Sequence, residues 1–226
     1  MPVVGSNSMT DLLIIGKAIE EIKTKSFGTT EQFLAVHEVV YDNDMPKAKR
    51  VDIQGDENTA IVYFPVKGVS FYLAVYLDTE PEISVRHVGT EPCSIVYFRA
   101  TSDTLSLSDI SGLTRLGYTS GWDKGDKRKL GDLRYNFSAF HFEPNPEPDE
   151  LKDKLNKLLD FLESDKSGVA SLVEKANGYI QVAIYYHYGS SSLGGIHLNR
   201  ELMKRLSALN LELDFDLYAE GNPFKD

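Results

Sequence analysis

Five histidines are the side chains in this chain best suited to acid–base or metal chemistry: His37, His87, His141, His187 and His197. A metal site would need two or three of them to converge with a carboxylate. The spacings H-x-H, H-x-x-x-H and H-E-x-x-H do not occur. His141 and His187 each stand in an aromatic, strand-like stretch, which is typical of a hydrogen-bonded histidine in a sheet. The sequence therefore predicts no metal ligand and no cofactor.

The nucleophilic residues form no catalytic motif. Cys93 follows a proline at the start of an expected strand, with no neighbouring base or helix N-terminus to favour a thiolate, so we expect a small buried side chain. The serine run at 190–192 lacks the G-x-S-x-G pattern of a nucleophile elbow. We interpret YGSSSLGG as a connector, and an anion site built from its backbone amides is the alternative. No catalytic residue is predicted.

Asp214 and Asp216 are a pair of carboxylates two residues apart on an expected strand. They lie on its polar side, opposite Leu213 and Phe215. General acid–base work would require one of them to be buried with a raised pKa. We interpret the pair as the solvated side of the strand. The phosphate-binding patterns G-x-G-x-x-G and G-x-x-x-x-G-K-[ST] are also missing.

The segment 121–129, GWDKGDKRK, has the most unusual composition. It holds the only tryptophan, with four basic and two acidic residues. Tryptophan beside arginine and lysine is typical of a hot spot for partner binding. The alternative is that the tryptophan folds back over the sheet while the charges stay in water. The first interpretation makes binding residues of Trp122, Lys124, Lys127 and Arg128.

Composition and charge exclude several classes of protein. The 226 residues carry 24 Lys and Arg against 34 Asp and Glu, a net charge of −10. This balance argues against a nucleic-acid partner, which requires a basic surface. No apolar run is long enough for a membrane span, and the first residues lack the pattern of a signal peptide. A single cysteine excludes an internal disulfide. We expect a cytoplasmic protein that contacts no membrane.

The spacing of apolar residues predicts one helix and then five strands in the first half. The helix covers 10–25, and the strands cover 33–41, 49–54, 59–66, 71–77 and 82–88. Their short, turn-rich connections require antiparallel pairing. In the second half we expect strands at 93–100, 134–142, 178–188 and 211–218, and helices at 106–116, 149–165, 168–176 and 199–210. Residues 118–134 are expected to form a polar loop.

These elements predict an α+β protein. Residues 1–91 form a helix plus an antiparallel meander. Residues 92–226 form a two-layer, ferredoxin-like α/β sandwich, in which a strand–helix–strand unit occurs twice. The second half also resembles a known family through GGIHLNRELMKRLSALNLELDFDLYAEG near its end, with CSIVYFRATS, LSLSDISGLTRL and DELKDKLNKLLDFLE before it. Over residues 93–221 the chain is similar to the bacterial domain-of-unknown-function family 4279. That resemblance implies a fold and no activity, and it leaves the first 90 residues as an extra domain.

Two functions remain open on the sequence. The first is a non-enzymatic protein-binding module, of immunity type or regulatory, with a basic protein partner attracted by the net negative charge. The alternative is a small-molecule-binding or enzymatic domain that uses a groove between the two halves, with polar groups from His141, Tyr185 and His187. The sequence does not decide whether the protein is an enzyme, nor its oligomeric state.

Overall fold

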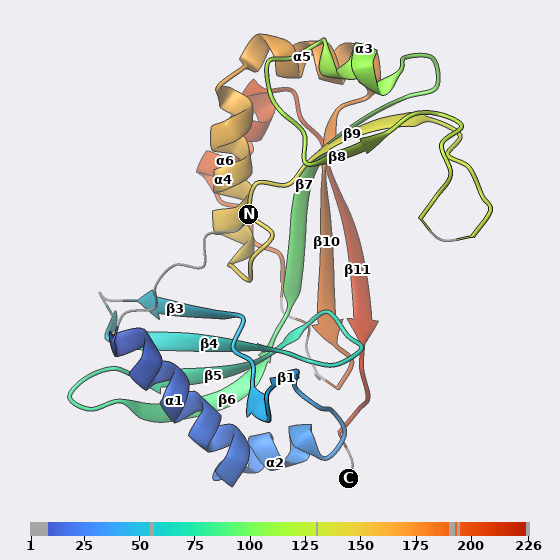
Figure 1. The fold of residues 1–226 in the computed structure, drawn as a ribbon. Coiled ribbons are helices and arrows are strands. Elements are labelled where there is room, and N and C mark those ends of the chain that lie inside the picture. The colour runs from blue at the N-terminus through green and yellow to red at the C-terminus, as the bar shows by residue number, and fades with distance from the viewer. Residues whose placement is uncertain (1–8, 55–56, 130, 190–192, 194, 225–226) are drawn as a thin grey trace. The chain divides into compact units, whose positions relative to one another are not determined.

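The computed structural model describes residues 9–54, 57–129, 131–189, 193 and 195–224, and its helices and strands fall into two compact units (Figure 1). Unit 1 comprises Met1–Cys93, Tyr185–Leu193 and Tyr218–Asp226. Unit 2 comprises Ser94–Ile184 and Gly194–Leu217. Mixed helix and strand content with antiparallel pairing confirms the predicted α+β class. No helix in the described part of the chain is long and apolar enough to cross a membrane.

Unit 1 is built on a four-stranded antiparallel sheet in the order β3-β4-β5-β6. These strands are β3 (Arg50–Gln54), β4 (Thr59–Pro65), β5 (Tyr72–Asp78) and β6 (Ser84–Glu91). The expected meander is therefore present. A small two-stranded ladder joins β1 (Tyr41–Asp42) to β2 (Met45–Pro46), and the helices are α1 (Met9–Thr24) and α2 (Gly28–Leu34).

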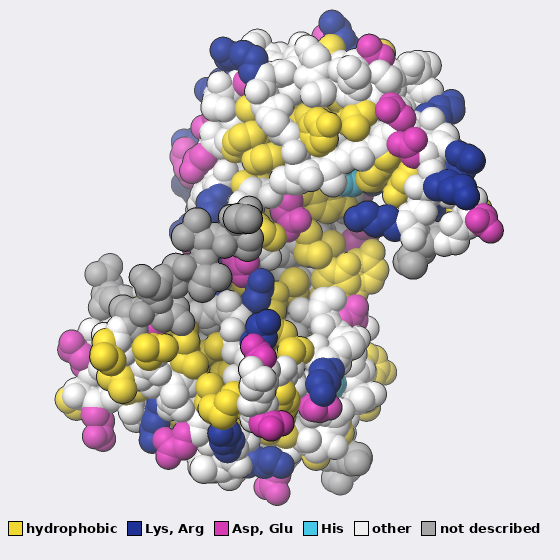
Figure 2. Space-filling view, in the orientation of Figure 1, with side chains coloured by type: hydrophobic (Ala, Val, Ile, Leu, Met, Phe, Trp, Pro, Cys, Tyr) yellow, Lys and Arg dark blue, Asp and Glu magenta, His cyan; other side chains and the backbone are white. Residues whose placement is uncertain are grey.

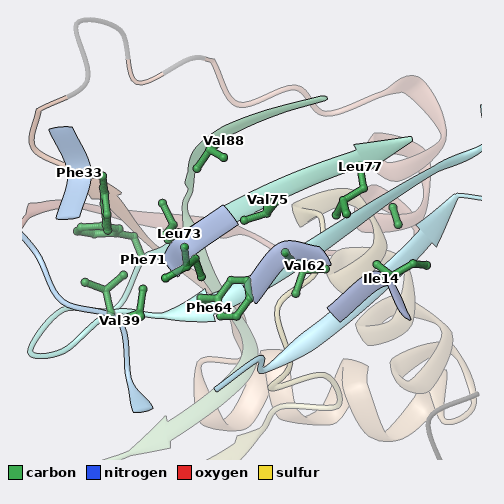
Figure 3. Packing of buried hydrophobic residues seen from close by; sticks show 14 residues of the cluster. Ile14, Phe33, Val39, Val62, Phe64, Phe71, Leu73, Val75, Leu77 and Val88 are labelled. Carbon is green, nitrogen blue, oxygen red and sulfur yellow. The ribbon is translucent and has the colours of Figure 1, made fainter. Parts of the chain in front are cut away.

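The core of unit 1 lies between α1, α2 and the inner face of this sheet (Figure 3). Apolar side chains alternate along the strands, so that Val62, Phe64, Leu73 and Val75 point inward and are almost fully buried. Figure 3 shows Phe33 and Phe71 side by side at one end of this core. Burial of each such side chain contributes about 1.5–3 kcal/mol to folding. This core fixes the end of unit 1 at which two histidines meet.

The predicted strand over 33–41 is wrong, because its first part belongs to α2. The Glu21 carboxylate, 3 % exposed, accepts hydrogen bonds from the Phe27 amide at 3.1 Å and the Thr30 hydroxyl at 2.6 Å. Burial raises the pKa of Glu21, but these hydrogen bonds outweigh burial and the net pKa is lowered. Glu21 of α1 thus holds the start of α2 through the Phe27 amide and the Thr30 hydroxyl. The two-residue spacing of apolar residues, on which the strand prediction rested, contains no sign of this contact between α1 and α2.

Unit 2 is built on a five-stranded sheet in the order β11-β10-β7-β9-β8. The strands are β7 (Cys93–Ser102), β8 (Ser120–Trp122), β9 (Ser138–Phe142), β10 (Tyr179–His187) and β11 (Leu213–Glu220). Cys93 and the ends of β10 and β11, from Tyr185 and Tyr218 onward, belong to unit 1. β9 pairs antiparallel with β7 and with β8. Along β10 and β11 the amides of Ile180 and Tyr188 donate to the carbonyls of Glu212 and Glu220, a constant offset that identifies a parallel pair. The expected strand–helix–strand unit at 178–218 is therefore present.

Four helices cover one face of this sheet: α3 (Leu107–Ser111), α4 (Leu151–Glu163), α5 (Lys166–Ala176) and α6 (Arg200–Ala208). Phe98, Phe140 and Val182 point to this side and are fully buried, as are Leu155 and Leu158 of α4. Asp165 caps α5 and also accepts from the Arg115 amide at 2.7 Å, which ties the end of α3 to α5. Those bonds hold the pKa of Asp165 far below its usual range.

The segment 118–134 is not simply the predicted polar loop, because it begins with β8. Only three residues pair, and Gly121 among them has no side chain to give an alternating pattern. A Cβ at Gly121 would meet Leu107 at 2.7 Å and the Ala139 carbonyl at 2.8 Å, so glycine is required for α3 to approach the strand. β8 adds an edge to the sheet and places Trp122 against β9.

Candidate functional site

The sheet face opposite α3–α6 carries the side chains that the sequence singled out in unit 2; we call it the open face. Register decides which residues share it. Arg99 is the cross-strand partner of His141, and Trp122 is the partner of Ala139, two residues before His141. Residues two apart on a strand point to the same side, so Arg99, His141 and Trp122 share the open face.

Six side chains form a connected cluster there, which we call the Trp122 cluster: Tyr97, Arg99, Trp122, Tyr135, Phe137 and His141. The Trp122 ring stacks on Tyr135 with centroids 4.2 Å apart and meets the His141 ring edge-on at 4.8 Å. Tyr97 lies 5.1 Å from His141. All six are half-buried. Ala139 shares this face and is fully buried, because the surrounding rings exclude water from the sheet.

Three nitrogens in this cluster are buried without a hydrogen-bond partner among the described residues. They are Arg99 Nε, Trp122 Nε1 and His141 Nε2. The Arg99 guanidinium lies over the Phe137 ring at 5.2 Å, and Phe137 lies 6.1 Å from Trp122. Arginine Nε and indole Nε1 can only donate. An unsatisfied buried donor costs about 1–3 kcal/mol, so the cluster favours any group that brings acceptor oxygens.

Burial and charge keep the His141 ring neutral at physiological pH. Burial in the cluster, together with the positive charge of Arg99, lowers the pKa of His141 to about 4. A neutral imidazole has one donor and one acceptor nitrogen. His141 is therefore equipped for hydrogen bonding and aromatic contact. Among the described residues, no carboxylate forms a hydrogen bond with His141 Nε2.

Beside the cluster lies the segment joining β8 to β9, residues 123–137, which we call the β8–β9 arm. Residues 124–134 hold five basic and two acidic side chains, in a chain whose net charge is −10. Lys127, Arg128 and Lys129 are exposed and form no ion pair with any described residue. Figure 2 shows Lys and Arg side chains gathered over this arm, next to hydrophobic ones.

Two hydrogen bonds join the start of the arm to residues at and before α3. Asp123 accepts from the Leu107 amide at 2.6 Å, and Lys124 Nζ donates to the Asp103 carbonyl at 3.1 Å. Arg128 lies over the Tyr135 ring at 5.3 Å. Of the predicted binding residues, Lys124 therefore has a local partner, whereas Lys127 presents its charge to solvent. Trp122 packs on the sheet, as the second interpretation of this segment expected for its ring.

The opposite edge of the open face is acidic. Gln181 of β10 donates to Asp216 Oδ2 at 3.2 Å, which places Asp216 on the same face as Gln181. Asp214 shares that face and is exposed, as is Asp216. Their exposure agrees with the interpretation of the pair as the solvated side of the strand. The open face thus runs from acidic at β11 to basic at the β8–β9 arm.

Unit 1 contains a second histidine cluster, formed by His37, His187 and the aromatic rings of Phe33, Phe71 and Phe224. The two imidazoles lie edge-on with centroids 5.0 Å apart, and His187 is 2 % exposed. The Asn222 amide donates to His37 Nε2 at 2.9 Å, while the Asn222 carbonyl accepts from His187 Nε2 at 3.0 Å. A backbone N–H can only donate a hydrogen bond, and a backbone carbonyl oxygen can only accept one. Neutral His37 therefore carries its proton on Nδ1, and neutral His187 carries its proton on Nε2.

Burial, together with His187, lowers the pKa of His37. A surface pocket of about 500 Å³ adjoins this ring, lined by His37, Glu38, Lys67 and Asn222 among others. The Lys67–Glu38 ion pair lies at its rim, and both side chains are exposed. The pocket offers mainly charges that are already paired, together with a His37 Nε2 that Asn222 already occupies.

The predicted site residues thus fall into two groups. Trp122, Lys124, Lys127, Arg128 and His141 belong to unit 2, and Trp122 contacts His141 directly. Tyr185 and His187 belong to unit 1, where Tyr185 stacks on Tyr218 at 4.8 Å. Neither unit by itself brings together the three polar groups of the alternative function.

Sequence reasoning missed Arg99 and Tyr97, which complete the Trp122 cluster. A signal for them exists: in CSIVYFRA the apolar Val96 and Phe98 alternate with Tyr97 and Arg99. Such alternation places the tyrosine and the arginine on the face away from the core. His37 was missed as a partner of His187, and no local pattern connects residues 150 positions apart.

The other residues considered for chemistry are Cys93, the possible metal ligands and the serine run. Cys93 is half-buried, and its Sγ lies 3.6 Å from the Tyr72 hydroxyl. Among the described residues, no three His, Cys, Asp or Glu side chains are placed to hold a metal ion. The serine run at 190–192 and Gly194 lie outside the described residues.

A family model described as Domain of unknown function (DUF4279) matches residues 91–220, more than half of the chain. The chain belongs to this family. The predicted resemblance over 93–221 is thereby confirmed, and the DUF4279 region runs from β7 to the end of β11. It contains the whole Trp122 cluster, whereas residues before 91 lie outside it. Neither a curated protein nor a solved structure matches the chain.

Proposed function

We propose that this protein is a non-enzymatic protein-binding module that holds its partner on the open face of unit 2. The observation that carries the proposal is the Trp122 cluster: half-buried rings around three buried nitrogens that have no partner among the described residues, beside an exposed cationic arm. Tryptophan, tyrosine and arginine dominate binding hot spots, because they bury much area and donate directed hydrogen bonds. A partner's acceptor oxygens would satisfy the donors that this chain leaves open.

The charges of the open face suggest how the partner is oriented. Acidic groups of the partner would face the β8–β9 arm, where Lys127 and Arg128 are exposed. Basic groups would face Asp214 and Asp216 at the β11 edge. The basic partner expected from the net charge of −10 stays a prediction, and this acidic edge is where such a partner would make contact.

An immunity-type or regulatory role in the bacterial cytoplasm is the finer form of the proposal. It is supported by the acidic composition and by the aromatic-rich sheets, with 12 Tyr and 11 Phe. The enzymatic or small-molecule alternative would need His141, Tyr185 and His187 in one site. The Asn222 backbone already bonds His187 Nε2, and His187 belongs to unit 1 whereas His141 belongs to unit 2.

Affinity capture from the native organism tests the proposal with matched baits. We expect the full chain to retain a protein that Trp122→Ala and Tyr135→Ala fail to retain. Met203→Ala is the control, because Met203 is a large exposed apolar residue on α6, which covers the opposite face. Circular dichroism establishes that each bait is folded. Retention of the same protein by all four baits, or of none by the wild type, contradicts the proposal.

A further inference from the structure

The unpartnered donors of the Trp122 cluster narrow the chemistry of what binds there. Arg99 Nε and Trp122 Nε1 each have a hydrogen to donate, and both atoms are buried. A neutral His141 becomes a third donor in its Nε2–H tautomer. Three buried donors and no unsatisfied carboxylate in the cluster favour an anionic group with more than one acceptor oxygen.

The surroundings of the donors also favour a planar anion carried on a chain. Guanidinium and indole donors beside aromatic rings suit a carboxylate, whose two oxygens lie in one plane and can accept from two donors at once. Lys127, Arg128 and Lys129, which are exposed and form no ion pair with a described residue, extend the positive charge along the β8–β9 arm beyond the cluster. A single small anion would use only the donors in the cluster. A segment with several carboxylates would use the cluster and the arm together.

We propose that the Trp122 cluster is a carboxylate-binding site for an acidic segment of a partner protein, with one Asp or Glu side chain seated against Arg99 and Trp122. This inference rests on the proposed function and specifies its chemistry. Neighbouring acidic residues of the segment pair with Lys127 and Arg128. The chain's net negative charge keeps acidic segments away elsewhere, so recognition depends on this local reversal of sign.

Trp122 is the only tryptophan, so its fluorescence reports on this site directly. The experiment titrates the full chain with a capped decapeptide of alternating Glu and Ser, and separately with the matched Gln–Ser peptide. We expect the Glu peptide to change the Trp122 fluorescence in a saturable way. The Gln peptide should bind at least about tenfold more weakly, because losing hydrogen bonds to a charged group lowers the affinity by about that factor. Equal affinity for both peptides, or no binding of the Glu peptide, overturns the inference.

Variants separate the cluster from general charge. Arg99→Gln should lower the affinity for the Glu peptide about tenfold or more. Arg99→Lys should not restore this affinity, because lysine lacks the Nε donor. Lys127→Gln with Arg128→Gln should weaken binding less and reduce its dependence on salt. Lys204→Gln on α6 is the matched control, an exposed cation whose loss should change nothing. Unchanged affinity in both Arg99→Gln and the double variant overturns the inference.

A third experiment uses sodium acetate as a competitor of the Glu peptide. We expect acetate to compete only at concentrations about a hundredfold or more above those of the peptide, because it lacks the contacts with the arm. Competition by acetate at equal concentration would identify a small-carboxylate site and overturn the protein-segment assignment. Should a partner be captured through Tyr135 while the Glu peptide fails to bind, the carboxylate chemistry is wrong and the protein-binding function stands.

Discussion

Unit 1 and unit 2 each place histidine within a cluster of aromatic rings, but the two clusters differ in what meets the Nε2 atom. In unit 1 the backbone of Asn222 donates to His37 and accepts from His187, so one residue of the chain bonds both rings. In unit 2 the Nε2 atom of His141 has no partner among the described residues, nor do its neighbours Trp122 Nε1 and Arg99 Nε. The two clusters thus differ at Nε2, whereas Nδ1 of His37 and Nδ1 of His187 are buried without a partner among the described residues.

This difference explains why residue type alone does not locate a binding site. His187 and His141 both stand in aromatic strands, and their local sequences look alike. What separates them is the presence of a backbone segment on the ring: the turn at Gly221 and Asn222 reaches His37 and His187, whereas the described residues supply nothing equivalent at His141. The Nε2 atom of a buried histidine is open to a ligand only where no backbone segment already bonds it.

The largest expected effect comes from Gly221, which allows the backbone to reach His37. Its φ of +83° suits glycine, and a Cβ there would meet His37 Nε2 at 2.6 Å and the Phe71 ring at 3.0 Å. Gly221→Ala should lower the free energy of unfolding of unit 1 by about 3 kcal/mol, measured by urea denaturation.

Gly16→Ala is the matched control, because a Cβ at Gly16 on α1 meets nothing within 4 Å. Alanine favours a helix over glycine by about 1 kcal/mol, so this variant should be neutral or slightly stabilising. Equal stability of Gly221→Ala and wild type would show that the close approach to His37 is not needed in unit 1.

Acidification should affect the cluster in unit 2 next most strongly. The pKa of His141 is about 4 in the folded chain and near 6.5 when unfolded, so the unfolded state binds the proton first. Stability is fully present above pH 6.5 and falls as the pH drops from 6.5 toward 4, by about 2 kcal/mol after allowance for the ring's partial exposure. Urea denaturation followed by Trp122 fluorescence at several pH values measures this loss.

His141→Gln assigns the effect to this ring. His37 contributes a loss of the same sign, because its pKa is also lowered, whereas Glu143 opposes it, because burial raises the pKa of that carboxyl. The variant should flatten most of the profile between pH 6.5 and 4.5, above the range in which Glu21 and Asp165 titrate. A profile unchanged in His141→Gln would mean that the ring is not held neutral by burial.

The fold of both units was largely accessible from the sequence, whereas the two clusters were accessible only in part. The β-branched and aromatic residues of β4 and β5 and the leucine spacing of α4 are local patterns, and the structure confirms these elements. α2 was missed because its start is held by a residue of α1, Glu21, which accepts from the Phe27 amide and the Thr30 hydroxyl. β8 was missed because pairing with β9 stabilises a strand of three residues. Trp122 and His141 were identified by residue type. Arg99 lies beside them because of the register between β7 and β9, which cannot be read from the sequence.

A smaller effect is expected from the side chain of Asn222, which donates from Nδ2 to the Val36 carbonyl at 3.0 Å. Asn222→Ala removes this exposed bond and keeps the backbone bonds to both histidines. The free energy of unfolding should fall by about 0.5–1 kcal/mol. A loss as large as that of Gly221→Ala would show that the side chain, rather than the backbone, holds the cluster together.

The smallest expected effect concerns only which ring nitrogen of each histidine carries the proton. Nitrogen-15 NMR of the histidine side chains at pH 7.5 should find His37 as the Nδ1–H tautomer and His187 as the Nε2–H tautomer, because Asn222 donates to one ring and accepts from the other. His141, which lacks either constraint, should show a tautomer that shifts when the Glu–Ser peptide binds, while His37 and His187 keep theirs. Matching tautomers for His37 and His187 would mean that Asn222 does not bridge them. A fixed His141 tautomer in the saturated complex would mean that its Nε2 takes no part in binding.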